Sequence, residues 1–262
     1  MPQPLVRYAA QHGIALIEFD NPPANTYSYE MMTELDQAIL RARFDDEIYV
    51  LLLRGVGDKF FSAGADIEML NQVSPQFKYN FCLHANETLN RLERTPKLVI
   101  AALNGHAVGG GLEIAMACDL RLARRDAGQV GLPEIALGVL PGTGGSQRLT
   151  RHIGKARALE LMATGRRISF EEAQDLGLVH DIFDAQDYFE QVLAYARQFT
   201  PPNKASKAVG RIKLAVQAGA EMPLFEALSL EQELQAGLFS SADGQEGLRS
   251  YVTKSMPQFK GV

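Results

Sequence analysis

A glutamate that follows three consecutive glycines is the first feature of this chain able to do chemistry. The segment Gly109-Gly110-Gly111-Leu112-Glu113 lies between two apolar runs, Leu98 to Leu103 and Leu112 to Cys118. Glycines at a strand-to-helix turn let a backbone N–H approach a ligand closely, and the following helix points its positive dipole end at the same place. The segment therefore predicts an anion-stabilising turn with an acid or base beside it, which is typical of an active site.

Alternating strand and helix patterns surround this turn and must position it. Val99 and Ile100 favour a strand over the first apolar run, whereas Ala, Leu and Met favour a helix over the second. The other predicted segments are strands at 5–8 and 14–19, a helix at 29–43, a strand at 49–54, a loop at 59–66, a helix at 77–94 and a strand at 119–123. Such alternation is typical of an α/β core.

The strand signal fades from about Thr150, after which helices are expected at 156–164 and 169–176. Ser169 is the expected N-cap of the second helix, with Glu172 closing a capping box. After Pro201-Pro202 the chain is helical and more polar, which indicates a C-terminal extension. We therefore expect residues 1–200 to form the core with the active site and residues 201–262 to form a C-terminal helical region.

The composition excludes several classes of protein and partner. A chain of 262 residues with 46% hydrophobic and 22% charged residues is typical of a soluble globular protein. Its net charge of −5 argues against nucleic acid as a partner. No apolar run approaches the ~20 residues of a membrane span, and the N-terminus has no signal pattern. Cys82 and Cys118 indicate buried thiols in a reducing compartment, so we expect a cytoplasmic protein. The five histidines show no pattern of metal ligands.

Four motifs in order identify a resemblance to a known family. They are Phe60-Phe61-Ser62-Ala63-Gly64-Ala65-Asp66-Ile67, Asn104 to Glu113, Leu132-Pro133-Glu134-Ile135, and the PGTGGSQRL run from Pro141 to Leu149. Through them the chain resembles the crotonase (enoyl-CoA hydratase/isomerase) family from end to end. The resemblance implies an α/β spiral of ββα units whose C-terminal helices, within 201–262, assemble a homotrimer or a dimer of trimers. It also implies an acyl-CoA substrate, with coenzyme A as part of that substrate and neither a metal nor a redox cofactor.

By the same resemblance, the backbone amides of Ala65 and Gly110 form an oxyanion hole. A thioester carbonyl gains negative charge when its α-carbon is attacked or deprotonated, and two N–H groups aimed at its oxygen stabilise that charge. Gly64 allows an unusual backbone angle beside Ala65. The alternative is that both loops are ordinary tight turns, which the full set of motifs disfavours.

Glu113 and Glu134 occupy the two positions at which hydratases of the family carry their catalytic pair. Hydration needs one group to activate water and another to protonate the α-carbon, which two glutamates suit. The resemblance assigns the water to Glu113 and proton delivery to Glu134. Both lie in apolar segments, so burial and mutual repulsion should raise at least one pKa and leave the pair sharing a proton near neutral pH. The alternative is two surface carboxylates that cap a helix or a turn.

The residues that contact coenzyme A follow from the resemblance alone. The substrate-binding residues that it implies are Ala63, Asp66, Ile67, Gly109, Phe259 and Lys260. Of these, Phe259 and Lys260 would reach the coenzyme A phosphate of a neighbouring subunit, unless Lys260 is a solvated tail lysine. Glu68 stands where family hydratases often carry a lysine, and 21–25 lacks a common basic residue, so the phosphate contacts are expected to differ or to come from elsewhere.

Three other features keep alternatives open. The segment 124–130 is one residue longer than in the family, and we expect the extra residue in a turn near Ala127-Gly128. Tyr27 and Tyr29, with residues of 69–73, could line the acyl pocket or belong to the core. A basic cluster could serve subunit packing, coenzyme A or RNA, although a solvated face is preferred. The cluster consists of Arg148, Arg151, Lys155, Arg157, Arg166 and Arg167.

Both glutamates together with both oxyanion loops favour an enoyl-CoA hydratase, which adds water to a trans-2-enoyl-CoA to give 3-hydroxyacyl-CoA. One alternative is a Δ3,Δ2-enoyl-CoA isomerase that uses mainly Glu134. A second is another crotonase reaction, such as hydration of dienoyl or ring substrates or hydrolysis of the thioester, which the polar and aromatic stretch at 25–29 keeps open. The third is a non-enzymatic RNA-binding or scaffold homologue, against which the net charge of −5 counts.

Overall fold

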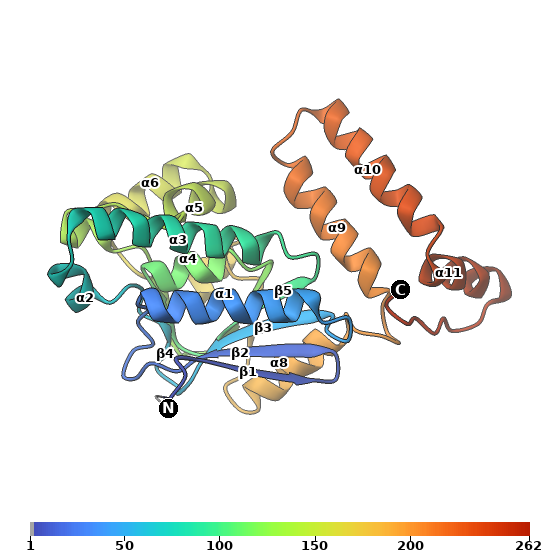
Figure 1. The fold of residues 1–262 in the computed structure, drawn as a ribbon, viewed down its shortest axis with the longest axis horizontal. Coiled ribbons are helices and arrows are strands. Elements are labelled where there is room, and N and C mark those ends of the chain that lie inside the picture. The colour runs from blue at the N-terminus through green and yellow to red at the C-terminus, as the bar shows by residue number, and fades with distance from the viewer. Residues whose placement is uncertain (1–2) are drawn as a thin grey trace.

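Six strands form the larger of two sheets in the computed structural model, which describes residues 3–262 (Figure 1). In order across the sheet, the strands are β1 (Val6–Gln11), β2 (Ile14–Phe19), β3 (Val50–Gly55), β5 (Leu98–Leu103), β7 (Leu120–Arg124) and β10 (Asp181–Phe183). β1 and β2 form an antiparallel hairpin, and the other neighbours pair in parallel. The carboxyl ends of β3, β5 and β7 therefore lie at one edge of this sheet.

A second sheet of four short strands continues from that edge. In order, it consists of β4 (Phe60–Ser62), β6 (His106–Val108), β8 (Gln129–Gly131) and β9 (Ile168–Ser169). β4, β6 and β8 are parallel, and β9 is antiparallel to β8. The chain leaves β3, β5 and β7 of the large sheet directly into β4, β6 and β8 of the small one, so it winds as a spiral of ββα turns. The predicted α/β class is confirmed.

Helices cover both faces of the large sheet, which explains why its central strands are apolar throughout. Since successive side chains of a strand alternate in direction, Leu51 and Val99 enter a core shared with α1 and α3, whereas Leu52 and Ile100 enter a core shared with α8. The helices that precede the three C-terminal ones are α1 (Tyr29–Phe44), α2 (Ile67–Gln72), α3 (Pro75–Glu93), α4 (Gly110–Met116), the 3-10 helix η1 (Glu134–Leu137), α5 (Gly145–Ile153), α6 (Lys155–Thr164), α7 (Phe170–Asp175) and α8 (Tyr188–Arg197).

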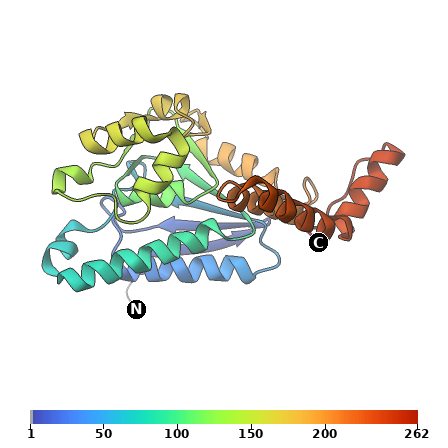
Figure 2. The same cartoon turned by 90° about the horizontal axis from the view of Figure 1, so that it is seen from above.

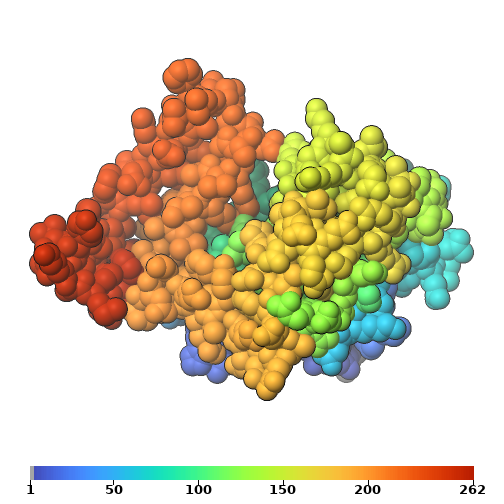
Figure 3. Space-filling model, turned by 180° about the vertical axis from the view of Figure 1, so that it is seen from behind, coloured from blue at the N-terminus to red at the C-terminus, as the bar shows by residue number. Residues whose placement is uncertain are grey.

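Three further helices extend away from the sheets: α9 (Ser206–Gly219), α10 (Leu224–Phe239) and α11 (Ala242–Thr253) (Figures 1 and 2). Seen from behind, α10 and α11 project to one side of the molecule, whereas α9 borders the core (Figure 3). α9 is fixed to the core by the buried Lys213 ammonium, which lies 2.8 Å from the Asp119 carboxylate. The boundary between 1–200 and 201–262, and a role of these helices in trimerisation, stay predictions. No helix within residues 3–262 is long and apolar enough to cross a membrane.

The structure contains four short strands that the sequence pattern does not predict. β4 lies in the segment predicted as a loop, β6 lies just before the glycine turn, and β9 and β10 lie where the strand signal fades. Each has only two or three residues, too few for an alternating pattern. Ser169 caps α7 as predicted, because its hydroxyl accepts the Glu172 N–H at 3.1 Å. The Glu172 carboxylate, however, pairs with Arg166 instead of completing the capping box.

Candidate active site

The loop that follows β4 holds Ala65 against an extended segment at Tyr27. The Tyr27 N–H donates to the Gly64 carbonyl at 2.9 Å, and the Asp66 N–H donates to the Tyr27 carbonyl at 3.0 Å. In this parallel bridge the Ala65 N–H points away from Tyr27, because successive backbone groups of an extended chain face opposite sides. Within residues 3–262 the Ala65 N–H meets no backbone acceptor. It is therefore available to a ligand.

The glycine turn brings a second donor to the same place. Gly109, the N-cap of α4, has φ +57° and ψ −132°, a conformation that essentially only glycine adopts. Gly110 is then the first helical residue, whose N–H has no intrahelical acceptor and lies at the positive end of the helix. A Cβ on Gly64 would lie 2.7 Å from the Gly110 nitrogen, so the two loops are in contact. The structure thus brings the predicted donors Ala65 and Gly110 together.

Glu113, in the first turn of α4, is buried among hydrogen-bond donors. Only 2% of the residue is exposed. Its Oε1 accepts the N–H groups of Thr143 at 2.8 Å and Gly145 at 2.7 Å, and its Oε2 accepts the Thr143 hydroxyl. Burial raises the pKa of the Glu113 carboxyl, and these hydrogen bonds oppose that rise because they favour the charged form. The loop before α5 therefore fixes the position of this side chain.

Two side chains hold the loop that holds Glu113. The Arg148 guanidinium donates to the Thr143 carbonyl at 3.3 Å and pairs with the Glu93 carboxylate at 2.8 Å. The Asn86 amide donates to the Gly142 carbonyl at 2.9 Å from α3. Because these contacts join α3 to α5 across the loop, the donors to Glu113 are pre-organised.

Glu134 opens η1 on the other side of the glycine turn. A Cβ on Gly109 would lie 2.9 Å from the Glu134 Oε1, so this carboxyl group borders the turn directly. Its Oε2 is buried and has no hydrogen-bond partner within residues 3–262. Desolvation raises the pKa of Glu134 to about 7, and repulsion by Glu113 adds to the rise. Glu134 is thus about half protonated near neutral pH and suited to general acid or base catalysis.

Thr143, Gly145 and Tyr27 are site residues to which the sequence analysis assigns no role in catalysis. Thr143 and Gly145 lie in the PGTGGSQRL motif, which is the sequence feature from which their role could be predicted. Tyr27 is 2% exposed, and its hydroxyl lies 3.5 Å from the Thr143 Oγ1. Tyr27 belongs to the hydrophobic core, as one of its two expected roles states, and this part of the core touches the candidate site. Tyr29, by contrast, is exposed.

The other predicted substrate-binding residues fall into two groups. Ala63, Asp66 and Ile67 flank Ala65, and the Asp66 carboxylate caps α2 by accepting the Met69 N–H at 3.0 Å. Phe259 and Lys260 belong to the C-terminal segment, whose end lies beside the C-terminal helices and away from α2 (Figures 1 and 2). Their segment is held by the buried Asp243, which accepts the Lys260 N–H at 2.7 Å. A single chain does not bring them to the site, so their reach across a subunit boundary stays a prediction.

The segment that is expected to carry an extra residue between the two glutamates forms a turn. β7 ends at Arg124 and β8 begins at Gln129, with Asp126 at φ +56° between them. Gly128 packs against His106, since a Cβ on it would lie 2.6 Å from the His106 nitrogen. β8 pairs with β6 beyond the turn, and this pairing leads the chain to Glu134.

The predicted basic cluster includes exposed arginines that are already paired. Arg151 lies 2.6 Å from the Glu221 carboxylate, and Arg166 lies 3.1 Å from that of Glu160. These ion pairs agree with the preferred interpretation as a solvated face. No group of three or more His, Cys, Asp or Glu side chains within residues 3–262 is arranged to hold a metal ion.

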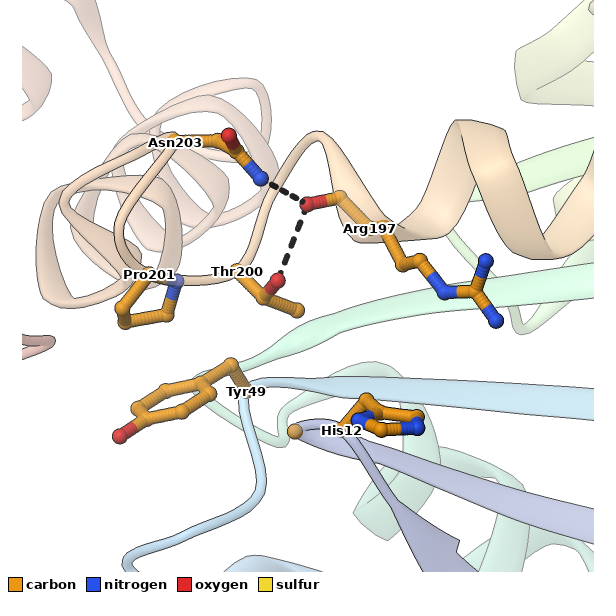
Figure 4. Close-up of a pocket in the computed structure, with 7 residues that line it drawn as sticks. His12, Tyr49, Arg197, Thr200, Pro201 and Asn203 are labelled. Carbon is orange, nitrogen blue, oxygen red and sulfur yellow. Dashed lines mark hydrogen bonds between the residues drawn. The ribbon is translucent and has the colours of Figure 1, made fainter.

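A cavity of about 530 Å³ lies away from the candidate site. It is bordered by the β1–β2 turn, the residue before β3 and the chain after α8 (Figure 4). Its lining residues are His12, Gly13, Tyr49, Arg197, Thr200, Pro201 and Asn203. It therefore opens at the amino end of β3, whereas β4 and the Ala65 loop follow the carboxyl end. We place the chemistry at the carboxylates and paired amides, since this cavity offers no comparable set of groups.

The fold and the site together define an α/β spiral with a glycine turn between a buried carboxyl group, Glu113, and a half-buried one, Glu134. The chain belongs to the enoyl-CoA hydratase/isomerase family, whose family model matches residues 9–262. It is 36% identical over 258 residues to a probable enoyl-CoA hydratase of Bacillus subtilis, covering 98% of each chain. It is 34% identical over 242 residues to a short-chain-enoyl-CoA hydratase of Clostridium acetobutylicum, covering 92% of each.

A solved structure of an enoyl-CoA hydratase from Geobacillus kaustophilus superposes with a TM-score of 0.97 at 45% sequence identity. The match covers 100% of this chain and 98% of that one. The fold expected from the resemblance, a crotonase-like spiral with C-terminal helices, is therefore confirmed.

Proposed function

We propose that this protein is an enoyl-CoA hydratase, which adds water across the 2,3 double bond of a trans-2-enoyl-CoA. Membership of the family and the names of its relatives support an enzyme that acts on an acyl-CoA. The observation that carries the proposal is the unequal hydrogen bonding of two carboxyl groups beside the same glycine turn, one buried and one half-buried. Glu113 accepts three hydrogen bonds, whereas one oxygen of Glu134 is buried without a partner within residues 3–262.

This inequality gives the two carboxyl groups opposite tasks. Glu113, whose ionised form its three donors favour, holds a water molecule and takes its proton as the oxygen bonds to the β-carbon. Glu134, protonated in part at neutral pH, gives its proton to the α-carbon. The Ala65 and Gly110 amides stabilise the negative charge on the thioester oxygen meanwhile, where losing one such donor typically costs ~10²–10³ in rate. Proton exchange between the two glutamates, or with solvent, restores the starting state.

The test is the loss of the conjugated enoyl-thioester absorbance when the protein is mixed with crotonyl-CoA. We expect turnover without added metal or redox cofactor, and 3-hydroxyacyl-CoA as the product. A Glu160→Gln variant, changed at an exposed carboxylate, is the matched control. Absence of turnover with short, medium, branched and aromatic enoyl-CoAs would refute the proposal. Conversion of a 3-enoyl-CoA that survives loss of Glu113 would instead identify an isomerase, and release of free coenzyme A a hydrolase.

We propose further that the protein assembles as a homotrimer or a dimer of trimers. Large apolar side chains are exposed on all three C-terminal helices, a distribution typical of surfaces that pack against another chain. They include Ile212, Val216, Leu224, Phe225, Leu248 and Val252. Light scattering should give three or six times the chain mass of 28.8 kDa. A monomer at micromolar concentration would contradict this assembly.

A further inference from the structure

Tyr27 is a buried residue that contacts both donor loops of the candidate site and, through Thr143, is linked to Glu113. Its backbone forms the bridge to Ala65, through the bonds to Gly64 and Asp66 described above. The donor loop after β4 therefore takes its position from the backbone of this residue.

The ring of Tyr27 sets the position of the second donor. A Cβ on Gly110 would clash with the Tyr27 hydroxyl and would lie 2.7 Å from its Cζ. The ring is backed in turn by Phe81 of α3, with 5.8 Å between the ring centroids. Because ring and backbone belong to one residue, the spacing between Ala65 and Gly110 is fixed by a single side chain and its own main chain.

The hydroxyl of Tyr27 extends the contact to Glu113. It lies 3.5 Å from the Thr143 Oγ1, and the Thr143 hydroxyl contacts the Glu113 Oε2. A threonine hydroxyl has one proton. If that proton goes to the carboxylate, the Thr143 oxygen is left as an acceptor and Tyr27 is the donor. The three groups then form one directed chain, from Tyr27 to Thr143 to Glu113.

We infer that Tyr27 is a positioning residue that holds both oxyanion donors and the Glu113 carboxylate as one unit. The contacts of Tyr27 are seen in the structure itself, whereas the catalytic roles of the groups that it positions rest on the proposed function. A tyrosine that only filled the core would affect stability without affecting the ionisation of Glu113. The two roles are therefore separable by experiment.

The first experiment is Tyr27→Phe, which removes the hydroxyl and keeps the ring. A net hydrogen bond of ordinary strength corresponds to about a 3- to 10-fold change, so kcat for crotonyl-CoA should fall by about that factor with KM within about twofold. The acidic limb of kcat/KM should move to higher pH, because a donor that favours ionised Glu113 is lost. Tyr79→Phe, at an exposed position of α3, is the matched control.

Other charged or titratable groups face Glu113, and they must stay unchanged if the shift of the acidic limb is to be assigned to Tyr27. They are Arg148 from α5, Cys82 from α3 and Glu134 from η1. If Cys82→Ala leaves both the melting temperature and the acidic limb of the pH profile unchanged, the Cys82 thiol does not determine the position of that limb. A Tyr27→Phe variant with lower kcat but an unmoved acidic limb would overturn the inference in favour of a purely structural role.

The second experiment is a double-mutant cycle with Thr143→Val, with Thr143→Ser as the variant that should restore the chain. In the Thr143→Val background, Tyr27→Phe should have little further effect on kcat, because the intermediate hydroxyl is gone. Multiplicative effects of the two changes would overturn the inference.

The same cycle in urea unfolding separates this inference from the proposed function. If the two residues are coupled, the unfolding constant of the double variant should differ at least about twofold from the value predicted by multiplying the two single effects. This holds whether or not the protein hydrates crotonyl-CoA. If the unchanged protein lacks hydratase activity, the proposed function fails, and this coupling alone decides whether Tyr27 acts through Thr143. A coupling of zero would overturn the inference in either case.

Discussion

Glu113 and Glu134 are the same side chain in two different settings. Glu113 lies in the first turn of a helix and accepts hydrogen bonds from a loop 30 residues further along the chain. Glu134 opens a single 3-10 turn, borders Gly109 and has a buried oxygen without a partner within residues 3–262. The difference teaches that burial alone does not define the task of a carboxyl group. The number of donors around it decides which proton state is stable.

The largest expected effect comes from removing either carboxylate. Glu113→Gln and Glu134→Gln should each lower kcat by ~10²–10⁴, the contribution typical of a positioned acid or base. Steady-state hydration of crotonyl-CoA measures this, beside the Glu160→Gln control. A near-normal rate in one variant would contradict the assignment of a catalytic role to both carboxyl groups, because only the other carboxylate would then be needed.

A pair of glycine substitutions should displace one carboxylate at a time. A Cβ on Gly145 would lie 2.8 Å from the Glu113 Oε1, just as one on Gly109 would lie 2.9 Å from the Glu134 Oε1. We expect Gly145→Ala and Gly109→Ala to lower kcat by ~10- to 100-fold, in line with the sensitivity of catalysis to small misplacements. Gly145→Ala should alter the acidic limb of the pH profile, and Gly109→Ala the alkaline limb.

Gly237→Ala is the control for this pair, because it lies in α10 and a Cβ there would meet no atom within 4 Å. It should leave both limbs unchanged. Identical pH profiles for the two site variants would contradict the separate roles of the carboxylates.

Stability should depend on pH through the Glu134 carboxyl group. The pKa of Glu134 rises from 4.5 to about 7 on folding, so between these values the folded state holds a proton that the unfolded state has lost. The unfolding free energy therefore falls as pH rises through this window. Glu134→Gln should stabilise the protein at pH 8 but hardly at pH 4.5.

Glu113→Gln should instead destabilise the protein at pH 8 by about 1–3 kcal/mol, because the three donors from Thr143 and Gly145 lose one of the two carboxylate oxygens that accept them. Urea titrations at both pH values measure the two differences. A destabilising Glu134→Gln at pH 8 would mean that Glu134 is paired after all.

The smallest effect is expected at Lys260, which touches neither carboxylate. If it reaches a phosphate of a neighbouring subunit's substrate, Lys260→Ala should raise KM several-fold, leave kcat unchanged and matter less at high salt. Both limbs of the pH profile should stay where they are. An unchanged KM would assign Lys260 to the solvated tail.

The sequence predicts the long elements and the reacting groups better than it predicts what holds them. Leu98–Leu103 is a strand as expected, because six apolar residues in a row carry a clear pattern. The site residues Glu113, Glu134, Ala65 and Gly110 were recognised because each lies in a contiguous motif. The contact of Tyr27 with Thr143 joins residues 116 positions apart, so no local pattern encodes it. The same holds for β9, two residues defined only by its pairing with β8.

Both donors of the candidate oxyanion hole are main-chain groups, at Ala65 and Gly110, and this affects how such a site can evolve. A mutation can delete a carboxylate at once, but it cannot delete a peptide N–H except by introducing proline. The capacity to stabilise a negative oxygen is therefore inherited with the loop geometry, while substitutions at Glu113 or Glu134 redirect the intermediate. A lineage with this fold can therefore change its reaction by single substitutions and keep the oxyanion stabilisation, which is usually the largest single contribution to catalysis.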